Sequence, residues 1–196
     1  MNTTTLIIII AVAVVVILLL AIFFAARHRR TQRSEQQRER TREEFGSEYE
    51  RTAQERGSEE EAERELRERR GQVERRVEPL SEERRGRHTE RWEEVERVFV
   101  ENPERSIEMA DRAVTDLLEE RKFVADPTQD DAETEADLAV MHPEVADDYR
   151  EGRRIRADVV SGAYRSSGEG APEETTEDLR RAIQRYRAVH EKLLRS

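Results

Sequence analysis

The stretch SEERRGRHTERWEEVERVFVENPERSIEMADRAVTDLLEERKFV, residues 81–124, decides the fold class of this chain. Its apolar residues recur every three or four positions, which is the period of an amphipathic helix and not the two-residue alternation of a half-buried strand. Asn102 and Pro103 divide the stretch, because asparagine is a preferred N-cap and proline a preferred first helical residue. The stretch therefore predicts two consecutive helices, with Trp92 on the apolar face of the first and Leu117 on that of the second.

Helix starts recur on both sides of this stretch. Ser58 opens the pattern SEEE, a capping box in which the serine and the third glutamate satisfy each other's free backbone amides. His142 before Pro143 repeats the order of cap and proline, and Thr175 or Thr176 opens the last helix. No stretch alternates like a half-buried strand. The sequence thus predicts an all-α fold with a small soluble bundle of about four to five helices.

The N-terminal part has a different character. Residues 6–26 are 21 consecutive apolar residues without a charge, so that a helix of this length would measure about 31 Å. This length matches the hydrocarbon core of a bilayer and predicts a single transmembrane helix. A cleaved signal peptide is the alternative, but its apolar run is shorter, about 7 to 15 residues, and a basic segment precedes the run instead of following it.

A basic cluster follows the predicted span directly, and its first arginines are Arg27, Arg29, Arg30 and Arg33. Residues 1–5 carry no charged side chain. By the positive-inside rule, the arginines place the N terminus outside and the rest of the chain in the cytoplasm. We also expect these arginines to contact anionic lipid headgroups of the bilayer.

Composition predicts how the chain is divided. The segment after the span is polar and basic and contains few apolar residues, which is typical of a stalk. Residues 1–5 are predicted to form a short extracytoplasmic tail, and residues 6–26 a transmembrane helix. Residues 27–57 are predicted to form a juxtamembrane stalk, and residues 58–196 a helical bundle. Within the bundle, residues 127–174 carry 5 basic and 13 acidic side chains, whereas residues 175–196 carry 6 and 3. This charge difference suggests that the last helix docks on the acidic middle.

Four stretches, in the same order, carry a resemblance to a known family: EFGSEYERT (44–52), PLSEERRGRHTERWEEVERVFVENPERSIEMADRAVTDLLEER (79–121), DLAVMHPEVADDYREGRRI (137–155) and TEDLRRAIQRYRAVHEKLL (176–194). In them the chain resembles a family of actinomycete-type bacterial proteins, membrane-anchored or secreted, with a helical domain of unknown function. The resemblance covers about residues 44–195 and implies a helical domain, but it carries over no activity, substrate or catalytic residue. The segment VVSGAYRSSGEGAPEET (159–175) is longer than is typical of the family.

Motifs that carry chemistry are missing from the sequence. The chain has no cysteine, which excludes disulfides and thiolate metal sites. None of its four histidines, His28, His88, His142 and His190, has the glutamate three residues earlier that helical di-iron sites use. Nucleophile-elbow, phosphate-loop and dinucleotide-binding motifs are absent as well. The sequence therefore predicts no enzyme activity and no catalytic, cofactor-binding or metal-binding residue, and it indicates that His142 acts as a helix cap and His190 as an edge residue of the last apolar face.

Three aromatic residues are candidates for binding a partner: Trp92, Tyr149 and Tyr186. Each stands at an inward position of a predicted helix, where a large ring most often anchors the core. The same residue types also anchor protein interfaces, and the sequence leaves both interpretations open.

These observations predict a non-enzymatic, single-pass protein of the bacterial inner membrane whose cytoplasmic bundle binds another protein or itself. An exported envelope domain, held by the same anchor or released by cleavage, is the first alternative. A ligand-binding bundle is the second, and it requires a buried polar cluster facing a cavity between the last two helices. Nucleic-acid binding is disfavoured, because the chain has a net charge of −10 and only the last helix offers a basic face. That face consists of Arg180, Arg181, Arg185 and Arg187.

Overall fold

The computed structural model describes residues 38–126, 128–161 and 172–196, and the chain divides into two compact units, Met1–Glu43 and Glu44–Ser196. Every regular element within the described ranges is a helix, which confirms the predicted all-α class. No helix among these residues is both long and apolar enough to cross a bilayer. The predicted span at residues 6–26 lies outside the described residues, and so does the arginine cluster behind it.

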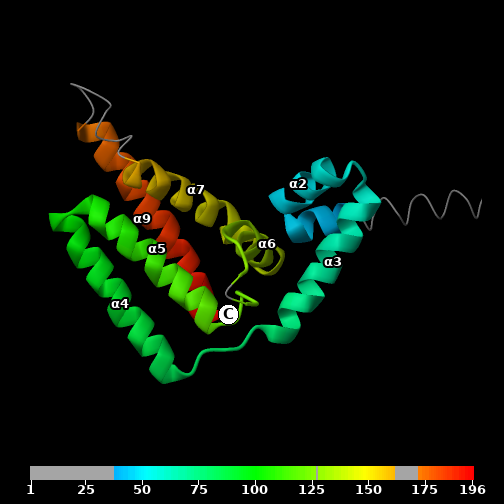
Figure 1. Ribbon diagram of the computed structural model, residues 1–196, viewed down its shortest axis with the longest axis horizontal. Coiled ribbons are helices and arrows are strands. Elements are labelled where there is room, and N and C mark those ends of the chain that lie inside the picture. The colour runs from blue at the N-terminus through cyan, green and yellow to red at the C-terminus, as the bar shows by residue number, and fades with distance from the viewer. Residues whose placement is uncertain (1–37, 127, 162–171) are drawn as a thin grey trace, which may run out of the picture. The chain divides into compact units, whose positions relative to one another are not determined.

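The second unit contains seven described helices, whereas the sequence predicts about four to five. They are α2 (Ser47–Arg56), α3 (Glu59–Arg76), α4 (Glu82–Glu101), α5 (Pro103–Glu120), α6 (Asp131–Met141), α7 (Pro143–Val160) and α9 (Pro172–Arg195). Helix α5 packs against α4 on one side and against α7 and α9 on the other (Figure 1). Helices α2, α3 and α6 pack on one another, and α6 also packs on α7. The docking of α9 on α7 agrees with the charge difference seen in the sequence.

Short polar side chains start the helices where the sequence predicts them. Ser58, Ser81 and Asn102 each accept a hydrogen bond from the backbone N–H three residues later, and Pro103 follows its cap as the first residue of α5. Such bonds satisfy amides that have no partner inside the helix. Asp130 caps α6 in the same way, although it is not among the starts predicted from the sequence. The other three starts depend on a few neighbouring residues, which explains why the sequence predicts them correctly.

Two other starts agree with the prediction only in part. Helix α7 begins at Pro143 with His142 at its N-cap position, as predicted, but the His142 side chain makes no capping hydrogen bond to a described residue. Its Nε2 atom lies 3.3 Å from the hydroxyl oxygen of Ser196 instead. Helix α9 begins at Pro172, before Thr175. Proline is favoured in the first turn of a helix, so this earlier start is also compatible with the sequence.

The boundary of the compact unit also differs from the prediction. The sequence predicts a polar stalk up to residue 57, whereas the unit begins at Glu44 and includes α2. Phe45 and Tyr49 are the reason, because both side chains are fully buried in the core although charged residues surround them in the sequence. Gly57 then ends α2 in a left-handed conformation, with φ 69°, which glycine adopts without strain.

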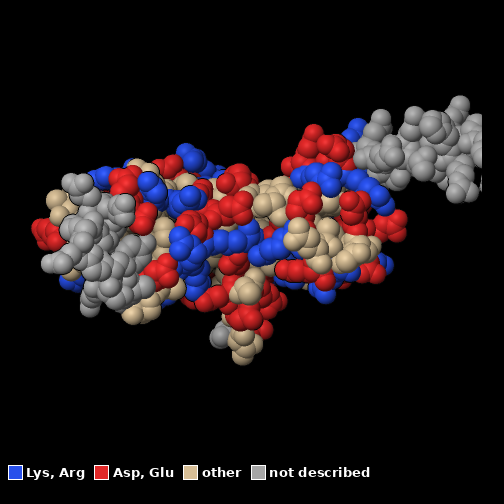
Figure 2. Space-filling view, turned by 90° about the horizontal axis from the view of Figure 1, so that it is seen from above, with Lys and Arg blue, Asp and Glu red and all other residues tan. Residues whose placement is uncertain are grey.

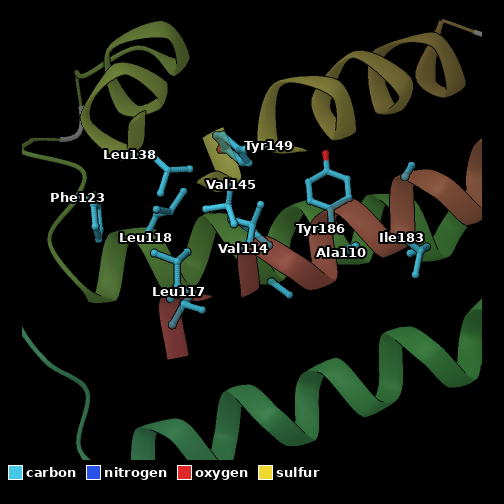
Figure 3. Close-up of a cluster of buried hydrophobic side chains, with 14 of the residues drawn as sticks. Ala110, Val114, Leu117, Leu118, Phe123, Leu138, Val145, Tyr149, Ile183 and Tyr186 are labelled. Carbon is cyan, nitrogen blue, oxygen red and sulfur yellow. The ribbon is translucent and has the colours of Figure 1, made fainter. Parts of the chain in front are cut away.

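The core is one continuous apolar cluster with α5 at its centre. Figure 3 shows side chains of α5, α6, α7 and α9 converging there. The fully buried members from α5 are Ile107, Ala110, Ala113, Val114, Leu117 and Leu118. Gly152 lets α7 approach α9 closely, since a Cβ atom at this position would lie 3.0 Å from the Tyr186 ring. A side chain larger than that of glycine would therefore need the Tyr186 ring to move.

Candidate functional site

A buried carboxylate lies where α5 meets α7 and α9. Asp111 is 6% exposed, and its Oδ1 atom accepts a hydrogen bond of 2.9 Å from the Tyr186 hydroxyl of α9. On the α7 side, the Nε atom of Arg156 lies 3.0 Å from the Asp111 Oδ2 atom, and Nε of Arg153 lies 3.9 Å from Oδ1. The negative charge of Asp111 thus faces two guanidinium groups and one hydroxyl, which makes its burial tolerable.

The network extends outward through Arg153. Its Nη1 atom donates to the Tyr149 hydroxyl at 3.1 Å and to Oδ1 of Asp131, in α6, at 2.8 Å. Burial raises the pKa of the Tyr149 and Tyr186 hydroxyls, and the Asp111 carboxylate raises that of Tyr186 further. Both phenols therefore stay protonated at neutral pH. The cluster of Asp111, Tyr149, Arg153, Arg156 and Tyr186, which we call the Asp111 cluster, connects α5, α7 and α9, and Asp131 extends the connection to α6.

The Asp111 cluster is the kind of buried polar group that the ligand-binding alternative requires between the last two helices. Its members, however, pair with one another and with Asp131. The Tyr186 ring also packs closely against Gly152 instead of lining an open space there. The arrangement is that of a tie between helices, in which Arg156 contributes an ion pair with Asp111 while its buried Nε atom makes no hydrogen bond to a described group.

The three aromatic candidates lie inside the described structure. Tyr149 of α7 and Tyr186 of α9 both lie within the buried cluster of Figure 3, both are fully buried, and Tyr186 donates to Asp111. Trp92 lies apart from them on α4, is 6% exposed, and stacks on the His190 ring with 4.7 Å between ring centroids. Its Nε1 atom donates to Oε1 of Glu96 at 2.7 Å. The positions of these rings match the core interpretation, since a partner reaching the surface would not meet them.

A second cluster fastens α4 to α5 and α9. Nε2 of His88 lies 2.6 Å from Oε2 of Glu120, and this hydrogen bond lowers the pKa of Glu120. His190 is 2% exposed, and no described group hydrogen-bonds its Nε2 atom. Burial lowers the pKa of His190 to about 4, so its ring is neutral at pH 7. The sequence places His190 at the edge of an apolar face, and the structure places it beneath Trp92.

A recess lies between α2, α3 and α6, with a volume of about 280 Å³. Charged side chains from these helices line most of it, and some of them pair between helices. Arg56 of α2 binds Glu65 of α3 through two nitrogens, and Arg51 of α2 lies 3.6 Å from Glu135 of α6. Among the residues that the structure describes, no three histidines or carboxylates gather into a metal site.

The basic face of α9 is largely occupied by carboxylates of the same chain. Arg185 donates to Asp148 of α7 at 2.8 Å, and Arg187 donates to Glu96 of α4 at 2.5 Å. Figure 2 shows arginines and carboxylates interspersed over the face that it draws. A helix whose arginines hold neighbouring helices offers few of them to phosphates.

Comparisons of the chain with known protein families, with curated proteins and with solved structures find no match. The resemblance seen in the sequence therefore stays a prediction. The residues of the chain itself carry the argument on function.

Proposed function

We propose that this chain is a single-pass membrane protein whose helical unit is a non-enzymatic interaction scaffold in the cytoplasm. The observation that carries the proposal is the apolar run at residues 6–26, followed directly by arginines at 27, 29, 30 and 33. A run of this length favours a spanning helix. The arginines favour retention of the following segment on the cytoplasmic side, where each adds about 1 kcal/mol of attraction to anionic headgroups.

The character of the helical unit supports an interaction role. In its buried polar clusters, Tyr186 donates to Asp111 and His88 is hydrogen-bonded to Glu120, and the face drawn in Figure 2 intersperses basic side chains with carboxylates. Among its described residues, the exposed large apolar side chains are Val100 and Val160, at 84% and 60% exposure, which lie on different helices. A partner would therefore recognise this unit mainly through charge, which governs specificity and association rate more than affinity. We propose another protein or a second copy of the chain as that partner.

The predicted topology is tested by fusing alkaline phosphatase or a fluorescent protein after Ser196 in separate strains. We expect fluorescence without phosphatase activity, because the arginines after the span retain the fused reporter in the cytoplasm. A matched control replaces the four arginines with asparagine and places arginines within residues 2–5, which should invert the two signals. Phosphatase activity of the unmodified chain would contradict the proposal and support the exported alternative.

The scaffold role is tested by photo-crosslinking in intact cells. A photoreactive residue at position 100 replaces a valine that is 84% exposed, so the fold should tolerate it. We expect an adduct with another protein or with a second copy, identified by mass spectrometry. The matched control carries the same residue at position 114, where Val114 is fully buried and only contacts within the chain are expected. The scaffold role would be contradicted if the yield of adducts at positions 100 and 160 does not exceed the yield at position 114.

A further inference from the structure

At its C-terminal half, helix α4 is fastened to α5 by neutral contacts. It packs along α5 and joins it at Asn102, which caps α5 (Figure 1). Val95 is fully buried, and its carbonyl oxygen accepts a hydrogen bond of 2.8 Å from the buried Ser106 hydroxyl of α5. Protonation at mildly acidic pH does not change any of these groups.

The N-terminal half of α4 is fastened by groups that titrate. Most of the contacts that these groups make with α5 are with Glu120. They come from His88 at 2.6 Å, from Arg84 at 3.1 Å and from Arg87 at 3.5 Å. Arg91 pairs with Asp116 of α5. Protonation of a carboxylate removes the charge that holds these cations.

His190 of α9 lies beneath this half of α4. The ring stacks on Trp92, and the His88 ring lies 6.5 Å away from it, centroid to centroid. His88 of α4 faces the His190 ring, and Glu120 of α5 is hydrogen-bonded to His88. Arg187, which is also in α9, is paired with Glu96 of α4. A hydrogen bond with the His88 backbone raises the pKa of His190, but burial and the charge of His88 lower it to about 4. The surroundings thus suit a neutral His190 ring and disfavour a charged one.

We propose that residues 82–92 form a flap that acid releases from α5 and α9 while the rest of the unit stays folded. Protonated His190 would face His88 across 6.5 Å, and opening would bring both rings into water. The flap is held at each end by contacts between neutral groups. These are the Ser106–Val95 hydrogen bond and a backbone hydrogen bond of 3.1 Å from Glu78 to the carbonyl of Arg121. The inference concerns the helical unit and does not depend on the side of the membrane on which it lies.

The direction of the pH effect follows from two groups. The pKa of His190 in the folded chain, about 4, lies below its ordinary 6.5, so its neutral ring stabilises the closed flap above pH 6.5. This stabilisation is lost as the pH falls from 6.5 toward 4. The pKa of Glu120 is lowered as well, so the contribution of its carboxylate is also present at neutral pH and lost on acidification. Both groups therefore favour release in acid.

The test uses the full chain in detergent, with Trp92 as its single tryptophan. Between about pH 7.5 and about pH 4.5, we expect Trp92 emission to fall and shift to longer wavelength, since a charged imidazole quenches indole and opening hydrates it. Amide exchange in residues 82–92, normalised to the intrinsic rate at each pH, should rise about tenfold or more, while α7 stays protected. Joint exposure of α7 and the flap would overturn the proposal, because it would indicate global unfolding.

Two variants locate the effect. His190→Phe keeps a ring against Trp92 but cannot titrate, so its flap should stay closed at about pH 4.5. His142→Gln is the matched control, because burial also lowers the pKa of His142 to about 4, but His142 lies between α6 and α7. Its flap should open like that of the unmodified chain. Opening of the flap in the His190→Phe chain at the same pH as in the unmodified chain would overturn the proposal.

A further measurement covers the case in which His190→Phe does not fold. The ring signals of His190 in the unmodified chain are followed by NMR through the same pH range. Their midpoint should coincide with that of the Trp92 emission. A His190 that titrates at a clearly different pH from the Trp92 change would overturn the proposal.

Discussion

Replacing Leu117 with aspartate should unfold the Glu44–Ser196 unit. Leu117 is fully buried in the last turn of α5, a helix that packs against α4, α7 and α9 (Figure 3). An aspartate there would place a carboxylate in an apolar environment without a partner, at a cost of several kcal/mol. This loss is comparable to the whole stability of a domain of this size, about 5 to 15 kcal/mol. We expect loss of the cooperative unfolding transition, followed through Trp92 emission in denaturant.

The matched control for this variant is Val100→Asp in α4. Val100 is 84% exposed, so the same change of side chain meets water and should alter the free energy of unfolding by no more than about 0.5 kcal/mol. A Leu117→Asp chain that unfolds with the same midpoint as the Val100→Asp chain would show that the inward face of α5 is assigned incorrectly.

The same helix shows why much of the fold is predictable from the sequence. The start of α5 depends on Asn102 and Pro103, which act within a single turn. Its inward face follows from residues three or four positions apart, such as Val114, Leu117 and Leu118, and all three are fully buried. Information of this kind is local, so one sequence contains it in full.

The misassigned boundary shows where local information fails. Phe45 precedes α2 and Tyr49 lies within it, four residues later, but the charged residues around them in the sequence favour an exposed stalk. Their burial depends on packing within the α2, α3 and α6 layer, which is distant in sequence. A pair of aromatic rings at helical spacing was the signal that could have indicated a buried α2.

The sequence does not predict the Asp111 cluster, again because its contacts join residues that are distant in the sequence. Asp111 lies four residues after Ile107 and three before Val114, so it continues an inward face with a polar residue. That position could have indicated a buried carboxylate. Its partner Tyr186, however, lies 75 residues away in sequence, and nothing local connects the two. The contact between them requires α5, α7 and α9 to be packed first.

Replacing Asp111 with alanine should therefore destabilise the unit by about 3 to 5 kcal/mol, because it leaves the Tyr186 hydroxyl and the Arg156 guanidinium without the carboxylate. Asp116→Ala is the matched control. Asp116 is on the same helix and pairs with Arg91, but its side chain is 47% exposed, so its loss should cost about 1 kcal/mol or less. The measurement is the free energy of unfolding of both full-length variants in denaturant.

A double-mutant cycle separates the tie from simple burial. Tyr186→Phe removes the donor of the 2.9 Å hydrogen bond. In a chain that already carries Asp111→Ala, this substitution should lower the free energy of unfolding less than it does in the unmodified chain. The difference, which is the coupling energy, should be about 1 to 3 kcal/mol. Equal effects of Asp111→Ala and Asp116→Ala, with no coupling to Tyr186, would contradict a structural tie. A buried carboxylate that adds nothing to stability would then need another role, and the ligand-binding alternative would become the better explanation of why Asp111 faces two arginines.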